Sequence, residues 1–111
     1  MIEITIRTHL VSALDVPVFL EQPENAPKSF VLFEKTGSAK SDKLPSSTFA
    51  FQSYAESLQK TAQLNNQVKE AVESLIQLDE IASVRLNSDY NFTDTATKRY
   101  RYQAVFDIYH Y

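Results

Sequence analysis

A single glycine, Gly37, most restricts what this chain of 111 residues can build. Loops that cradle phosphate groups need several glycines, because backbone N–H groups must approach the anion closely. Tight two-residue hairpins of the Asn-Gly kind are also missing from the sequence. We therefore expect strands that are joined by longer loops or by helices. Common nucleotide-dependent chemistry is not expected.

The composition predicts one packed domain, residues 1–111, without covalent or metal cross-links. Hydrophobic residues make up 43% of the chain and charged residues 23%, which favours a core over disorder. The absence of cysteine excludes disulfides, thiolate metal sites and cysteine nucleophiles, and it fits a reducing cytoplasm. A net charge of −3 argues against general nucleic-acid binding. No segment resembles a signal peptide or a membrane span, so we expect a small, soluble, intracellular protein.

Two segments have the apolar spacing of a helix. The first is residues 2–14, where one apolar helical face consists of Ile2, Ile6, Leu10, Ala13 and Leu14. Asp15 and Pro17 end this pattern. Residues 55–79 form the longer predicted helix, with Ser53 or a nearby polar residue as its cap and Glu56 in its first turn. Its apolar stripe consists of Leu64, Val68, Ala71, Leu75 and Leu78.

Five segments have the character of strands: 16–20, 29–35, 47–55, 83–92 and 98–110. Pro17 cannot donate to a neighbouring strand, which places residues 16–20 at a sheet edge. Residues 36–47, "TGSAKSDKLPSS", have the composition of a loop. Alternation predicts one shared face for Phe49, Phe51 and Ser53, and another for Val84, Leu86, Tyr90 and Phe92.

The order of these elements predicts an α+β fold. Runs of adjacent strands that are joined by loops favour antiparallel pairing. We therefore expect a small, mainly antiparallel sheet with two helices packed on one face, in the order α-β-β-β-α-β-β.

No group of residues predicts catalysis, a metal site or a cofactor site. The acidic pairs Asp89 with Asp94, and Asp79 with Glu80, have no histidine or third carboxylate at ligand spacing. Asp94 lies between two threonines, a pattern typical of a turn. His9 and His110 have no serine or aspartate partner in a recognisable arrangement. We expect no enzyme, no metal and no cofactor.

The segment "KRYRY", residues 98–102, leaves two interpretations open. A platform for single-stranded nucleic acid needs aromatic and cationic side chains on one exposed surface. Alternation instead places Tyr100 and Tyr102 on the core face with Ala104, Phe106 and Ile108. The opposite face is typical of a protein interface. The candidate interface residues are Arg99, Arg101, Gln103, Asp107 and Tyr109, together with Lys40 and Lys43 of the predicted loop.

Three segments, "VPVFLEQPE", "QSYAESL" and "NFTDTATKRYRYQAVF", carry a resemblance to a known group of proteins. The chain resembles, over nearly its whole length, small tail components of tailed phages of Gram-positive hosts. It is similar to the tail terminators of phages, or prophages, with long non-contractile tails. The resemblance implies a non-enzymatic virion protein of the tail, present in the host cytoplasm during assembly.

Further properties are implied by that resemblance. The protein would form a hexameric ring that caps the head-proximal end of the tail tube, stops tube polymerisation and docks the head connector. Its partners would be itself, the major tail tube protein and a head-completion or connector protein, with no membrane and no sequence-specific nucleic acid. It could stay monomeric in solution until it meets the tail. Another head–tail joining or minor tail component, and a sheet-based module for single-stranded nucleic acid, are the alternatives.

Overall fold

The chain forms helices on one side of a single sheet over residues 1–41 and 44–111, the part that the computed structural model describes. The elements in chain order are α1 (Ile2–Ala13), β1 (Val18–Phe19), β2 (Phe30–Ser41), β3 (Leu44–Tyr54), α2 (Leu58–Glu73), the 3-10 helix η1 (Ser74–Gln77), β4 (Ile81–Asn91) and β5 (Arg101–His110).

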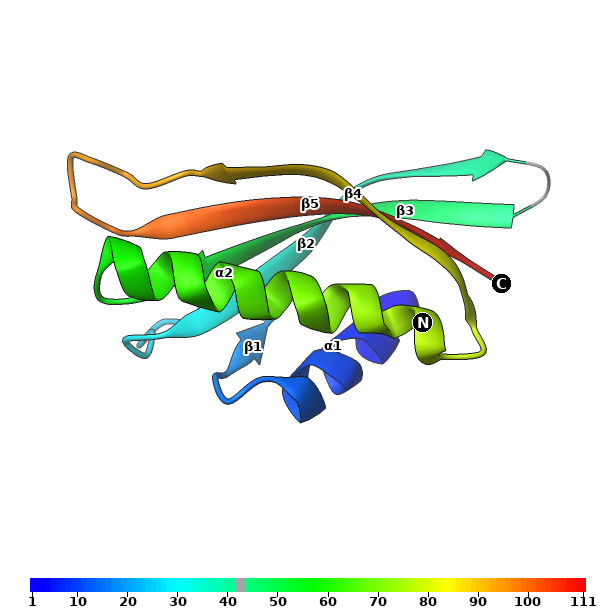
Figure 1. The fold of residues 1–111 in the computed structure, drawn as a ribbon, viewed down its shortest axis with the longest axis horizontal. Helices are drawn as coiled ribbons and strands as arrows, with labels where there is room; N and C mark the ends of the chain where they lie inside the picture. Colours follow the sequence, from blue (N-terminus) through cyan, green and yellow to red (C-terminus); the bar gives the residue numbers. More distant parts are fainter. Residues whose placement is uncertain (42–43) are drawn as a thin grey trace.

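The strands lie in the order β1-β2-β3-β5-β4. The short edge strand β1 runs parallel to β2, and every other neighbouring pair is antiparallel. Both α1 and α2 lie against the same face of the sheet (Figure 1). This arrangement confirms the predicted α+β class, the two helices on one face and the element order.

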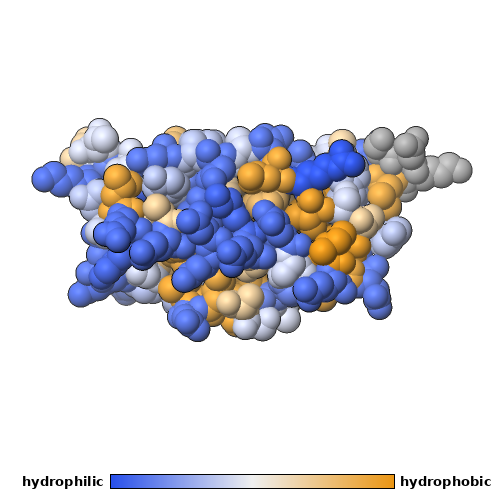
Figure 2. Space-filling model, in the orientation of Figure 1, coloured by the Kyte–Doolittle hydropathy of each residue, from blue (hydrophilic) through white to orange (hydrophobic). Residues whose placement is uncertain are grey.

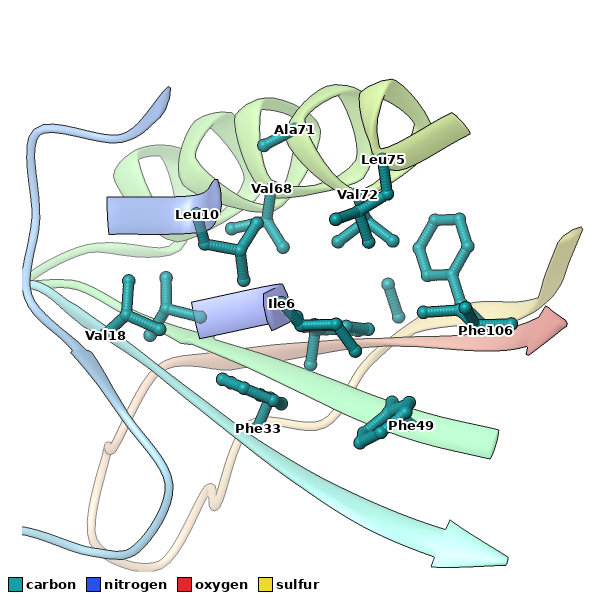
Figure 3. Packing of buried hydrophobic residues seen from close by; sticks show 14 of the residues in the cluster. Ile6, Leu10, Val18, Phe33, Phe49, Val68, Ala71, Val72, Leu75 and Phe106 are labelled. Atoms are coloured by element: carbon teal, nitrogen blue, oxygen red, sulfur yellow. The ribbon is translucent and has the colours of Figure 1, made fainter. Parts of the chain in front are cut away.

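The core lies between the two helices and the sheet. Figure 3 shows side chains from α1 and α2 pointing towards the aromatic side chains of the strands. Fully buried residues with no measurable exposure include Ile6, Leu10, Val31, Phe33, Phe49, Phe51, Val68, Val72, Leu75, Ala104, Phe106 and Ile108. The rings of Phe51 and Phe106 meet edge to face, with centroids 5.9 Å apart, which is a favourable aromatic geometry. The predicted helical stripe is confirmed for Leu64, Val68, Ala71 and Leu75, whereas Leu78 lies beyond η1 and is only partly buried. The predicted core face of β5 is confirmed for Ala104, Phe106 and Ile108.

The helix ends differ from those predicted. The long helix begins at Leu58 rather than at residue 55, because Ser57 is extended and its side chain accepts a hydrogen bond from the Lys60 amide at 3.2 Å. Ser53 is therefore not the cap, but a buried residue of β3. Glu56 precedes the helix rather than lying in its first turn. The helix ends in the tighter turn η1, and not in regular α-helix up to residue 79.

The predicted loop 36–47 is wrong for all of its described residues. Residues 36–41 continue β2 and residues 44–47 begin β3, with pairing out to Ser41 and Leu44. A bulge between Lys35 and Gly37 shifts the pairing of β2 with β3 by one residue. The resulting β2–β3 hairpin extends beyond the last turn of α2 (Figure 1). The expectation that longer loops join the strands is therefore also wrong here.

A bulge between Leu86 and Ser88 in β4 reverses which side of the strand faces the helices. Leu86 pairs with Phe106 on the helix side, whereas Tyr90 pairs with Gln103 on the opposite side. The prediction that Tyr90 and Phe92 share the face of Val84 and Leu86 is wrong for this reason. Because the bulge inserts an extra residue into β4, the side chains before and after it no longer alternate with a single period of two.

Candidate protein interface

The face of the sheet away from the helices carries no covering element among residues 1–41 and 44–111, and we call it the outer face. Its polar side chains bond to one another across strands. The Gln52 side-chain amide donates to Gln103 over 2.8 Å, and that of Gln103 donates to the Tyr90 hydroxyl. In a second row across the strands, the Asp107 carboxylate accepts hydrogen bonds from the Thr48 hydroxyl at 2.7 Å and from the Asn87 side-chain amide at 3.2 Å. These bonds satisfy the polar groups and hold them in fixed positions.

One end of the outer face carries cationic and aromatic side chains in contact, which we call the arginine–aromatic cluster. Its members are Phe30, Tyr54, Phe92, Arg99 and Arg101. The Phe30 and Tyr54 rings stack with centroids 4.5 Å apart. The Arg101 guanidinium lies 4.2 Å from the Phe92 centroid and 5.8 Å from that of Tyr54, while Arg99 lies 4.9 Å from Tyr54. These are distances at which cation–π attraction operates.

A pocket of about 560 Å³ opens beside this cluster, where the turn before β2, the segment between β3 and α2, and the β4–β5 turn meet. Its charged lining residues are Lys28, Glu56, Asp94, Lys98, Arg99 and Arg101. Four cations against two carboxylates leave a local formal charge of +2. The pocket is therefore suited to a negatively charged group rather than to a cation.

The β4–β5 turn fixes one of those carboxylates. Asp94 Oδ1 accepts a hydrogen bond from the Ala96 amide at 3.0 Å. Hydrogen bonds from the Thr97 side chain and then the Ala96 backbone hold the pKa of Asp94 below its ordinary value, and the charge of Arg101 adds to the effect. Asp94 therefore stabilises the β4–β5 turn, the role that its position between two threonines predicts.

The structure brings most predicted interface residues together. Arg101, Gln103, Asp107 and Tyr109 share the outer face of β5, and Arg99 lies just before that strand. Lys40 is exposed on the β2–β3 hairpin, apart from this group, and Lys43 lies outside the described residues. The partners that sequence reasoning missed are Phe30, Gln52, Tyr54, Asn87, Tyr90 and Phe92. Only the pairing of the strands identifies these residues as neighbours of the predicted ones, and the alternation within a single strand does not give that pairing.

Tyr100 and Tyr102 are half-buried, so they are neither fully in the core nor fully exposed. Alternation places the arginines opposite Tyr100 and Tyr102, and the register of β5 confirms this for Arg101 and Tyr102. The alternation does not indicate that Tyr54 of β3 and Phe92, the residue after β4, meet Arg101 on the outer face. Aromatic and cationic side chains do share one surface.

Both histidines have a serine neighbour that the sequence does not indicate, at 3.5 Å between Ser47 Oγ and His110 Nε2 and more closely for His9. The Nε2 of His9 lies 2.7 Å from Ser74 Oγ. However, Ser74 Oγ donates its only proton to the Ala71 carbonyl at 2.6 Å, so the imidazole must donate to the serine. A nucleophilic serine needs the reverse arrangement, in which the imidazole accepts. This pair joins α1 to the end of α2.

Asp89 joins β4 to α2 rather than forming an acidic pair with Asp94. It accepts from the Asn65 amide at 2.7 Å and from Lys69 Nζ at 2.5 Å. Within residues 1–41 and 44–111 no group of three histidine or acidic residues is placed to hold a metal ion. In the same part of the chain, no helix is long and apolar enough to cross a membrane.

Comparison with known proteins adds no family assignment to this geometry. No protein-family model matches the chain, and a search of curated proteins returns no match.

Proposed function

We propose that this chain is a non-enzymatic structural protein of a phage or prophage tail, a tail terminator. In this proposal it forms a ring, most simply a hexamer, at the head-proximal end of the tail tube. The ring stops tube polymerisation and presents a docking surface to the head connector. It acts in the virion after assembly in the host cytoplasm, with the tube protein and a connector or head-completion protein as partners.

The observation that carries the proposal is the uncovered outer face of the sheet. Both helices pack on the other side, so this face is free to meet a neighbouring subunit. It presents half-exposed aromatic rings, with Tyr90 at 41% and Phe92 at 43% exposure, beside arginines and fixed amides. Tyrosine and arginine are the residues that most often dominate the binding energy of protein interfaces.

The β2–β3 hairpin supports a second contact, with the tail tube. Its far part projects beyond the helices, where the strands have only each other as neighbours. Pairing of β3 with β5 begins at Ser46, so Leu44 and Pro45 pair with β2 alone. This far part of the hairpin contributes little to the core and is available to a partner. Lys40 is exposed on it.

The test is whether purified protein halts growth of tail tubes. Tube protein is polymerised with and without this chain, and tube lengths are measured by electron microscopy. Shortened tubes with a ring at one end are expected from the wild type, with a weaker effect from Lys40→Glu. The matched control is Lys60→Glu, an exposed lysine on α2. Normal tube growth and no binding would overturn the proposal; binding to connector protein alone would favour another head–tail joining component.

A second candidate function, binding of single-stranded nucleic acid, is favoured by one observation. The arginine–aromatic cluster places cations and rings on one surface, as stacking platforms require. The test is retardation of a single-stranded oligonucleotide over a range of salt concentrations. Retardation that weakens with salt and disappears in Phe92→Ala would establish this function. Absence of binding at low salt would eliminate it.

A further inference from the structure

The two ends of the molecule carry opposite charge. The basic end is the pocket beside the arginine–aromatic cluster, with its formal charge of +2. The acidic end comprises Glu70, Glu73, Asp79 and Glu80, all exposed, at the end of α2 and the turn into β4. No lysine or arginine occurs between residues 70 and 84, so this segment has a formal charge of −4.

These charges are not neutralised within one molecule. The ion pairs among the described residues are Lys35 with Glu3 and Lys69 with Asp89, and neither involves a residue of the two ends. The two ends lie at the opposite ends of α2 (Figure 1). Sixteen residues at 1.5 Å rise separate them by roughly 24 Å, about three Debye lengths at physiological salt. A single copy cannot bring them into contact.

Exposed apolar side chains accompany the charge at both ends. Ile76 is 50% exposed beside the acidic end, and Ile4 of α1 is 57% exposed. Figure 2 shows hydrophobic residues gathered near the C-terminal end of α2, next to its hydrophilic side. At the basic end, Leu58 and Phe92 are each 43% exposed. Burial of such side chains supplies affinity, while the charges orient the encounter.

We propose that the basic end of one copy binds the acidic end of a second copy, in a repeated head-to-tail contact. The occupant of the pocket is then the acidic segment 73–80 of the neighbour. A head-to-tail contact uses two different surfaces of each subunit, so it closes into a ring or continues as a filament. The inference rests on the self-association in the proposed function and adds the residues and polarity of the contact.

A charge-swap experiment tests this contact. One variant, Lys28→Glu with Arg99→Glu, changes the basic end from +2 to −2. The other, Glu73→Lys with Asp79→Lys and Glu80→Lys, changes the acidic end from −4 to +2. Each variant alone is expected to lose self-association in sedimentation velocity at low salt. An equal mixture is expected to regain self-association, because each contact between the two variants joins ends of opposite charge. Unfolding curves check that both variants fold.

Disulfide trapping can detect the contact even if it is too weak to be seen by sedimentation. The natural chain has no cysteine, so a mixture of Arg99→Cys and Asp79→Cys chains can form disulfides only at the introduced positions. We expect cross-linked dimers from this mixture well above those from a control mixture of Arg99→Cys with Gln63→Cys, an exposed residue in the middle part of α2. Equal yields, or self-association unchanged in both charge variants, would overturn the contact.

The two proposals fail separately. If the wild type caps tubes and neither charge variant changes association, the head-to-tail contact is wrong and the tail function stands. If association follows the charge swap but the protein ignores tube protein, the contact stands and the tail function is wrong. A salt-dependent oligonucleotide complex that Lys28→Glu with Arg99→Glu abolishes, without charge-dependent self-association, would assign the basic end to nucleic acid.

Discussion

Arg101 of β5 donates from Nη1 to the Tyr54 hydroxyl of β3 over 3.2 Å. The same side chain donates from Nε to the Phe92 carbonyl at 3.0 Å and lies over the Phe92 ring. One arginine thus connects two neighbouring segments of chain to its own strand. The guanidinium suits this role because its donors form a fixed, planar fork.

Removing that side chain should destabilise the fold. Arg101→Ala loses two hydrogen bonds and two ring contacts, so we expect a loss of about 1–2 kcal/mol in the free energy of unfolding. Arg101→Lys should recover little of it, because an ammonium cannot reproduce the fork. Urea unfolding followed by circular dichroism measures both. The comparison variant is Arg99→Ala, which loses only an exposed ring contact; if it costs as much as Arg101→Ala, the interpretation is wrong.

Asp89 has a comparable role between β4 and α2. In Asp89→Ala the buried Asn65 amide loses its acceptor, which should cost about 1–3 kcal/mol in unfolding free energy. Lys69→Ala removes the other donor, but that ammonium is partly exposed and water replaces the bond, so we expect less than about 1 kcal/mol. Equal losses in the two variants would contradict the assignment of the main cost to Asn65.

The start of α2 depends on Ser57. Ser57→Ala removes the acceptor for the Lys60 amide and should cost about 1 kcal/mol. Ser57→Gly should cost only a few tenths, because water reaches the freed amide and glycine is tolerated at this position. Thermal unfolding of the three proteins provides the measurement. The reverse order of stability would show that the cap contributes nothing.

The turn between β4 and β5 should loosen at low pH. The pKa of Asp94 is lower in the folded chain than in the unfolded chain, so the ionised carboxylate stabilises the turn above about pH 4, the unfolded value. That stabilisation is lost as the pH falls through the lower folded pKa. NMR titration of Asp94, with hydrogen exchange of the Ala96 amide, measures the effect. Asp94→Asn is the control, and its Ala96 exchange should show no step over this range.

Periodicity predicted the fold wherever the two faces of an element differ strongly in environment. Phe49, Phe51 and Ser53 alternate with Gln52 and Tyr54 on β3, and the structure places them on opposite faces as expected. The helical stripes succeeded for the same reason, apart from Ala13, which is exposed at the end of α1, and Leu78, which lies beyond η1 and is only partly buried. The spacing of apolar residues along the sequence reflects the burial of one face of each helix or strand.

The β2–β3 hairpin could not be predicted in this way because its residues have low strand propensity. Gly37, Pro45 and the serines are typical of loops. They form strands here because backbone pairing continues from the buried part of β2 and β3, assisted by bonds such as Thr36 Oγ1 to the Thr48 carbonyl at 3.3 Å. Tertiary context overrides propensity at this position.

The candidate interface was half predicted. Its β5 residues follow from alternation, because Arg101, Gln103 and Asp107 are two or four residues apart. Their partners follow from register, which pairs Tyr54 with Arg101 and Gln52 with Gln103. Contacts between strands distant in sequence depend on which residues stand opposite one another, and a single sequence does not contain that information directly.

The bulge after Leu86 makes the number of residues in β4 as important as the side chains that the strand places against its neighbours. Residues before it place Val84 against the core, and residues after it turn Asp89 towards Asn65 and Tyr90 towards Gln103. Deleting one residue here would exchange the two sides of everything that follows, whereas many substitutions would alter only one contact. Natural variation in this segment should therefore conserve its number of residues more strictly than the identity of its exposed side chains.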